Sequence, residues 1–81
     1  MLFTNKYDSY GKKIHDCDLI KVSFIHGMEK VYVVEWCHAN SGFIIKPIKE
    51  PWDLGYSLAF LESDRIKKFE VIENSNMITT N

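Results

Sequence analysis

The stretch DSYGKKIHDCDLIKV, residues 8–22, decides the fold of this chain. Gly11 marks a turn, because glycine adopts positive φ without a steric penalty. Ile14 then supplies an isolated apolar side chain, which we expect to point into a core. Asp16 and Asp18 indicate a second turn, since their short carboxylates can accept hydrogen bonds from nearby backbone N–H groups. The stretch therefore predicts the entry corner of a small β-barrel or a tightly curled sheet.

The other strand signals are short and evenly spaced. Ile20, Val22 and Phe24 alternate with polar residues, which is the period of a half-buried strand. Residues 53–62 fit both strand alternation and helical spacing, so this segment is open between the two. We predict strands at residues 19–25, 31–36, 43–46 and 67–72. The expected fold is mainly β: a curled antiparallel sheet or partly open barrel of about five strands, with at most one short helix or helical turn.

Length and composition favour one small globular domain. The chain has 81 residues, of which 46% are hydrophobic, and this is enough for a core in a single domain. We place the domain at residues 1–81, with its core at 7–76. The polar ends, residues 1–6 and 77–81, are expected to fray.

The charge balance disfavours a nucleic-acid module. The chain carries 10 basic and 11 acidic residues, and Arg65 is its one arginine. Proteins that bind nucleic acid usually carry a basic excess and several arginines for phosphates and base edges. Residues 1–6 do not resemble a secretory signal, and no apolar run approaches the roughly 20 residues of a membrane span. We therefore expect a protein of the bacterial cytoplasm with no membrane partner.

Cysteine and histidine provide the conceivable metal ligands. Cys17 and Cys37 lie beside His15 and His38, respectively. Structural zinc sites usually contain tight pairs such as Cys-x-x-Cys, and adjacent residues on a strand point to opposite faces. This spacing favours a buried thiol and solvent-facing imidazoles, so we predict no metal and no cofactor. Nucleophile elbows, P-loops and dinucleotide fingerprints are missing from the sequence, and we expect a protein that is not an enzyme.

Three stretches together resemble the YopX family of small phage and prophage proteins. The first is the run in which Asp8, Gly11, Ile14, Asp18 and Ile20 keep the spacing D-x-x-G-x-x-I-x-x-x-D-x-I. The second is the predicted hairpin VVEW…SGF at residues 33–43, and the third is FEVIEN at residues 69–74. The resemblance covers about residues 7–76 and implies a compact, mostly β domain encoded by a phage or an integrated element.

Two positions depart from the family pattern. Cys17 and Glu73 stand where the family usually has glycine. If those glycines need positive φ, this chain must bend differently there or carry strain. The resemblance assigns the corner itself a structural role, which we place on Gly11, Ile14, Asp18 and Asn74.

Aromatic and basic residues are the candidate binding groups. Aromatic side chains are enriched at interface hot spots and on base-stacking surfaces, although most of them pack into the core of a small domain. The candidates for partner binding are Trp52, Tyr56, Tyr32 and Trp36, and Trp52 is the best candidate for exposure, because it lies in a polar bend. The candidates for a basic patch are Lys12, Lys13, Lys67 and Lys68, unless these lysines only protect a strand edge.

Two functions of different classes follow from these features. The first is a non-catalytic protein-binding module of a phage or mobile element, which modulates or inhibits a host or phage protein. The alternative is a small β-barrel that binds single-stranded nucleic acid through its aromatics and lysine doublets, and steep salt dependence would identify it. Homo-oligomers are compatible with either function, because an open sheet leaves strand edges.

Overall fold

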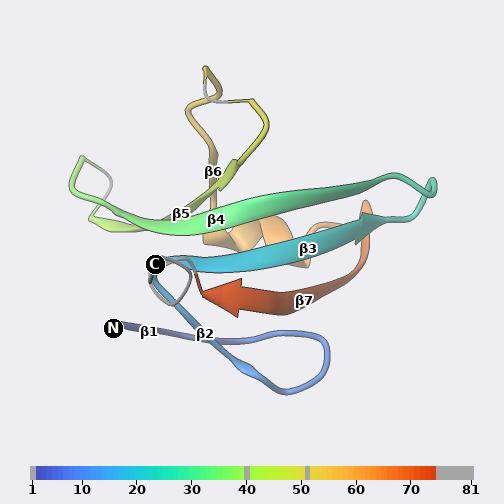
Figure 1. Ribbon diagram of the computed structural model, residues 1–81, viewed down its shortest axis with the longest axis horizontal. Helices are drawn as coiled ribbons and strands as arrows, with labels where there is room; N and C mark the ends of the chain where they lie inside the picture. The colour runs from blue at the N-terminus through green and yellow to red at the C-terminus, as the bar shows by residue number, and fades with distance from the viewer. Residues whose placement is uncertain (1, 40, 51, 75–81) are drawn as a thin grey trace, which may run out of the picture.

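The computed structural model describes residues 2–39, 41–50 and 52–74. Within these residues the chain forms a five-stranded antiparallel sheet and a separate two-stranded sheet (Figure 1). The elements in chain order are β1 (Phe3–Tyr7), β2 (Lys13–His15), β3 (Asp18–Phe24), β4 (Glu29–Cys37), β5 (Gly42–Pro47), β6 (Tyr56–Ser57), the 3₁₀-helix η1 (Leu58–Glu62) and β7 (Ile66–Asn74).

The larger sheet has the strand order β6-β5-β4-β3-β7, so β4 is its central strand. The first and last of these strands do not pair with each other, and the sheet is not closed into a barrel. The predicted mainly β fold is therefore confirmed, including the single helical turn. The segment that fitted two periods contains both structures, since β6 pairs with β5 before the chain turns into η1.

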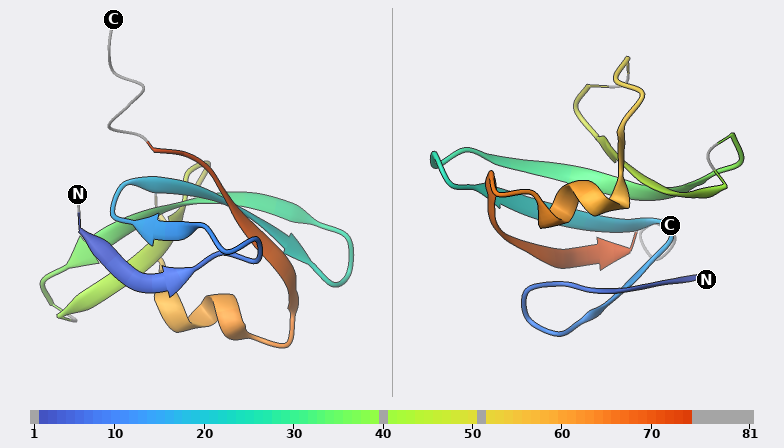
Figure 2. Two further views of the ribbon diagram at one scale, coloured as in Figure 1. Left: turned by 90° about the horizontal axis from the view of Figure 1, so that it is seen from below. Right: turned by 180° about the vertical axis from the view of Figure 1, so that it is seen from behind.

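One face of the large sheet carries the core. Its buried side chains include Ile20 and Val22 of β3, Val34 of β4 and Ile45 of β5. Leu58 and Leu61 of η1 and Ile14 of β2 complete the same core cluster. Figure 2 shows η1 on this side of the sheet, from behind the sheet and from below. Burying one such aliphatic side chain contributes about 1.5–3 kcal/mol.

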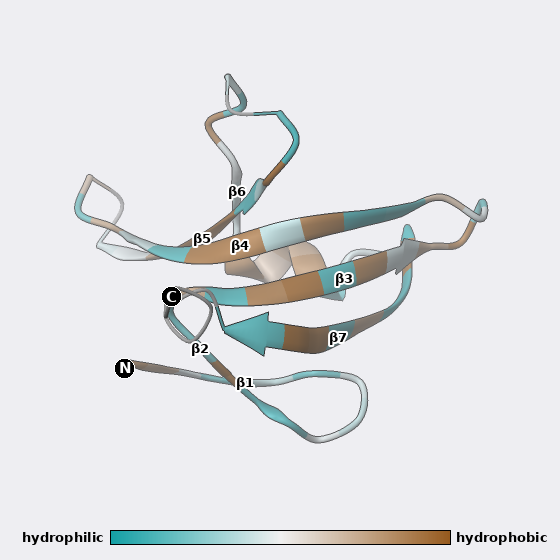
Figure 3. Ribbon diagram, in the orientation of Figure 1, coloured by the Kyte–Doolittle hydropathy of each residue, from teal (hydrophilic) through white to brown (hydrophobic). Residues whose placement is uncertain are grey.

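The opposite face of the sheet, here called the outer face, alternates apolar and charged side chains. Val31 lies opposite Lys21 in the register of β3 and β4, and Val33 lies opposite Lys46 in the register of β4 and β5. Figure 1 looks onto this face with η1 behind it, and Figure 3 shows the alternation of hydrophilic and hydrophobic residues along the strands. These side chains are only half-buried, so the outer face is available for contacts.

The N-terminal residues are paired, which differs from the expected frayed end. Phe3–Tyr7 forms β1 and pairs antiparallel with β2. A bulge at Asn5, whose φ is 67°, interrupts the register of β1 and β2. Because of this bulge and the polar residues around it, the sequence of β1 lacks the regular alternation that would identify a strand. The terminus is also held by the side chain of Asp16, whose Oδ1 accepts a hydrogen bond of 2.7 Å from Leu2 N–H. Residues 77–81, which were also expected to fray, lie outside the described residues.

Candidate functional site

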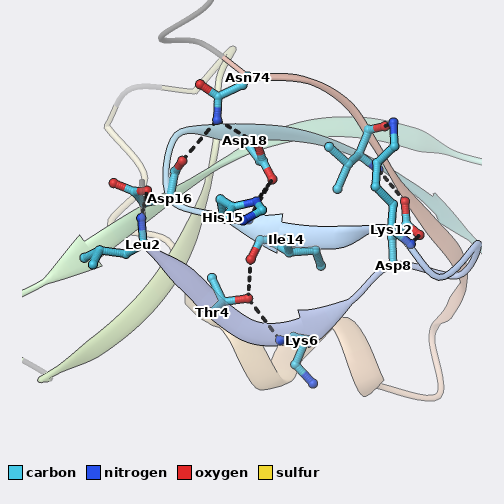
Figure 4. Close-up of polar contacts among 11 residues, drawn as sticks. Leu2, Thr4, Lys6, Asp8, Lys12, Ile14, His15, Asp16, Asp18 and Asn74 are labelled. Carbon is cyan, nitrogen blue, oxygen red and sulfur yellow. Dashed lines mark hydrogen bonds and ion pairs between the residues drawn. The ribbon is translucent and has the colours of Figure 1, made fainter.

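The corner between β2 and β3 is joined to the end of β7 by a buried carboxylate. Asp18 is buried and accepts two hydrogen bonds of 2.7 Å, from His15 N–H and from Asn74 Nδ2 (Figure 4). Asn74 Nδ2 also donates to the carbonyl of Asp16 at 3.2 Å. Asp18 and Asn74 are thus brought together although they are far apart in the chain. Gly11 and Ile14 belong to the adjoining hairpin, where Ile14 is fully buried.

Cys17 has the positive φ that its position in the corner was expected to require if glycine stood there. Its φ is 69°, which places a side chain in the left-handed region, and its N–H donates to the carbonyl of Val34 at 2.8 Å. This conformation costs a residue other than glycine about 1–2 kcal/mol. The backbone at Glu73 does not have a positive φ. Instead, the register of β3 and β7 shifts between Leu19 and Ile20, and one extra residue on β7 accommodates the bend.

Asp8 is a buried hydrogen-bond acceptor in the same corner motif. It was not among the structural residues of the corner that we expected from the sequence. Its carboxyl group accepts from the N–H groups of Tyr10 and Lys12, both at 2.8 Å, and from Val71 N–H at 2.9 Å. Burial raises the pKa of Asp8, but the hydrogen bonds from these three N–H groups and the charge of Lys12 outweigh it, so the pKa lies below its ordinary value. The Asp-x-x-Gly pattern of residues 8–11 is the signal that points to this residue.

The turn that contains Asp8 covers the edge of β7. Ser9 N–H donates to the carbonyl of Phe69, and Phe69 N–H donates back to Ser9 Oγ, both at 2.9 Å. Lys12 Nζ donates to the carbonyl of Val71 at 3.5 Å. The turn therefore satisfies backbone groups of β7 that would otherwise form an open strand edge.

The predicted lysine doublets lie on adjoining segments at this edge, but their side chains have local contacts. Lys13 Nζ lies 5.3 Å from the centre of the Phe3 ring, and Lys68 Nζ lies 6.0 Å from the centre of the Tyr10 ring. A hydrogen bond with Tyr10 raises the pKa of Lys68. Lys12, Lys13 and Lys68 therefore make contacts within the hairpin or between the hairpin and β7, and the basic patch stays a prediction.

The predicted aromatic binding residues do not form one surface. Tyr32 is only 2% exposed and belongs to the core. Trp36, at the end of β4, packs edge-on against Phe43 with ring centres 5.1 Å apart. Tyr56 and Trp52 line two separate grooves. Of these aromatics Trp52 is the most accessible, with 75% of its surface exposed.

Trp52 borders a groove of about 570 Å³ on the outer face. The floor comes from β3 and β4, and the far wall is the connection between β5 and β6. The lining includes Lys21, Lys30, Val31, Pro47, Glu50 and Trp52. Lys30 Nζ forms an ion pair with Glu50 at 3.0 Å, and this hydrogen bond raises the pKa of Lys30. The groove thus combines an apolar strip with charged side chains at its rim.

Hydrogen bonds join the described residues of the connection beside the groove to β4 and to one another. Ile48 N–H donates to the carbonyl of Val31 at 3.1 Å, and Gly55 N–H donates to Asp53 Oδ1 at 2.8 Å. Gly55 has a φ of 90°, and a Cβ there would lie 2.6 Å from the carbonyl oxygen of Ile45. Leu54 nevertheless projects outward and is 88% exposed. The described part of the loop thus presents apolar side chains to solvent. Pro51, part of the predicted bend, lies outside the described residues.

Among residues 2–39, 41–50 and 52–74, no group of three or more His, Cys, Asp or Glu side chains is placed to hold a metal ion. Within that described part, no helix has the length and apolar character needed to cross a bilayer. A scan against models of protein families, a search of curated proteins and a search of solved structures found no match to this chain.

Proposed function

We propose that this chain is a non-catalytic protein-binding module and that the groove beside Trp52 is its docking surface. The observation that carries the proposal is the exposure of Trp52 and Leu54 on a loop fixed by hydrogen bonds. Large apolar side chains on an ordered loop can bury their area on binding without a large loss of conformational entropy. Tryptophan is among the residues that most often dominate binding energy at protein interfaces.

The chemistry of the groove indicates what the partner presents. Lys30 and Glu50 neutralise each other, and Glu29 accepts a hydrogen bond from Ser23 Oγ at 3.3 Å. Lys21 and Lys49 also line the groove and have no ion pair within the described residues. A partner segment with an apolar side chain for the strip and an acidic side chain for these lysines fits this arrangement.

The contacts of the three aspartates at the turns favour a structural role for them over acid–base catalysis. Asp8, Asp16 and Asp18 each accept hydrogen bonds from backbone N–H groups at turns. A general acid or base must instead reach a substrate in a cleft. The resemblance to YopX proteins implies a protein of a phage or mobile element, and we propose on this basis that the partner is a host or phage protein that the module modulates or inhibits.

A tagged pull-down from bacterial lysate tests the proposal. The eluate is compared with and without nuclease at two salt concentrations, for the native chain, Trp52→Ala and Leu2→Ala. Leu2 is an exposed apolar residue on the far hairpin and is the matched control. We expect a stoichiometric protein that survives nuclease, is retained by Leu2→Ala and is lost with Trp52→Ala. Equal capture by both variants would refute the groove as docking surface, and nucleic acid released at high salt would favour the alternative function.

A further inference from the structure

A second cleft, of about 280 Å³, opens on the face of the sheet that η1 covers. Its lining includes residues at the end of the hairpin formed by β3 and β4 and at the start of β7. Figure 2 shows this hairpin end beside the start of β7. Residues that line the cleft include Tyr32, Tyr56, Phe60, His26, Lys30 and Arg65. Only Lys30 is shared with the groove beside Trp52. The cleft is therefore a separate feature, and it does not depend on the proposed docking surface.

Backbone hydrogen bonds hold the two turns that form the open end of the cleft. Ile25 N–H donates to the carbonyl of Arg65 at 2.9 Å, which joins the hairpin turn to the start of β7. Phe24 N–H donates to the carbonyl of Met28 at 2.8 Å and closes the hairpin turn itself. These bonds place the side chains of His26 and Arg65 at one corner although the residues are distant in sequence.

The inner wall of the cleft is an aromatic cluster with an accessible ring. Tyr56 stacks on Phe60 with ring centres 4.7 Å apart and an interplanar angle of 18°. Tyr32 contacts both rings, at 6.5 Å and 6.4 Å between centres. Tyr56 is 42% exposed, so the cluster presents aromatic surface to solvent. A planar ligand can extend such a stack, and stacking of this kind tolerates any base.

The charged side chains that line the cleft are all basic. Lys30 is neutralised by Glu50, and His26 carries charge when it is protonated. Arg65 is the one arginine of the sequence, and its guanidinium has no ion pair with any described residue. An arginine of this kind offers a planar fork of donors that matches a phosphate group.

We propose that this cleft binds a nucleobase that carries a phosphate, with the base against Tyr56 and the phosphate at Arg65. The volume limits the occupant, because ligand pockets usually measure roughly 300–1,000 Å³ and this cleft, at about 280 Å³, lies just below that range. We therefore propose an occupant no larger than one nucleotide. The nucleotide is either a free nucleoside monophosphate or one residue of a single strand, and the two sources share the same chemistry.

Titrations followed by NMR test this proposal on the full chain. The probes are AMP, adenosine, inorganic phosphate and a short single-stranded oligoadenylate with a 5′-phosphate. We expect AMP to shift the signals of His26, Tyr56 and Arg65 saturably, and adenosine and phosphate to bind more weakly. Tighter binding of the oligonucleotide than of AMP identifies a strand as the source, and equal or weaker binding identifies the free nucleotide.

Matched variants separate a built site from general attraction to a basic surface. Arg65→Ala and Lys67→Ala each remove one positive charge from an exposed residue near the start of β7. Arg65→Ala should weaken AMP binding at least about tenfold, as expected for one lost hydrogen bond to a charged group, while Lys67→Ala should leave it nearly unchanged. Tyr56→Leu should weaken AMP binding and Tyr56→Phe should preserve it. Absence of saturable shifts at millimolar AMP, or equal losses with Arg65→Ala and Lys67→Ala, would overturn the proposal.

Discussion

Replacing Asp8 by alanine should destabilise the whole domain, because this carboxylate joins the N-terminal hairpin to the edge of β7. Asp8 is 6% exposed and accepts from three backbone N–H groups. Water can replace the carboxylate for Tyr10 and Lys12, which lie in an exposed turn. The Val71 N–H is buried and cannot be satisfied in this way.

The expected cost follows from these three donors. A lost hydrogen bond to a charged group costs about 1.5–3 kcal/mol, and a buried donor left without an acceptor adds to it. We expect the free energy of unfolding to fall by about 2–4 kcal/mol for Asp8→Ala. Asp8→Asn should cost less, because its amide oxygen still accepts while its NH₂ group faces one of the former donors.

Urea unfolding followed by tryptophan fluorescence measures this change, and hydrogen exchange at Val71 locates it. The control is Asp64→Asn, which removes the same charge from an exposed turn and should change stability by no more than about 0.5 kcal/mol. If Asp8→Asn is no more destabilising than Asp64→Asn, the carboxylate does not stabilise the edge of β7 and the reasoning is refuted.

The pH dependence of the same variants gives an independent check. The folded-state pKa of Asp8 lies below its ordinary value, so the ionised carboxylate stabilises the fold above the unfolded-state pKa, and this contribution is lost as pH falls through the folded-state pKa. The stability difference between the native chain and Asp8→Asn should be constant near neutral pH and shrink below about pH 4. A difference that grows on acidification would contradict this sign.

Three further predictions concern the turns and the corner, and urea unfolding of the variants tests each of them. Cys17→Gly should be more stable than Cys17→Val by about 1–2 kcal/mol, because valine resists the φ of 69° and glycine adopts it freely; equal stabilities would exclude strain at this position. Gly55→Ala should cost about 1–3 kcal/mol, and more than Gly11→Ala, because a Cβ at Gly55 meets the Ile45 carbonyl at 2.6 Å whereas the space at Gly11 is open. Asn74→Ala should cost about 1–2 kcal/mol through the two bonds to the corner, and a change below about 0.5 kcal/mol would remove Asn74 from that role.

The sequence predicts the features of this fold that depend on local chemistry. Alternation identifies β3, and Asp18 is at a turn because its carboxylate accepts from His15 N–H, only three residues away. Strand β1 was missed because its three middle residues are polar, its register is broken by a bulge, and its partner comes only after a turn. The acceptor role of Asp8 toward Val71 depends on a contact between the two ends of the chain, which spacing along the sequence does not reveal.

The candidate sites show the same limit. Trp52 and Tyr56 are close in sequence, and a single binding face for both was the simplest expectation. The close approach of Gly55 to the Ile45 carbonyl bends the chain between them, and the two rings line different grooves on opposite faces of the sheet. The importance of Arg65 follows only from the hydrogen bond that places it beside the hairpin turn.

The separation of the two faces determines which variants can test the two proposals independently. Lys30 lines both the groove and the cleft, and it pairs with Glu50. Removing Lys30 could therefore weaken binding of the protein partner and of AMP alike, and its loss would not show which site is involved. Trp52 lines only the outer groove and Arg65 only the cleft over the core face. If both proposals hold, Trp52→Ala loses the protein partner and retains AMP, whereas Arg65→Ala loses AMP and retains the partner. Loss of both activities in each variant would mean instead that the two surfaces are one site or that the fold is damaged.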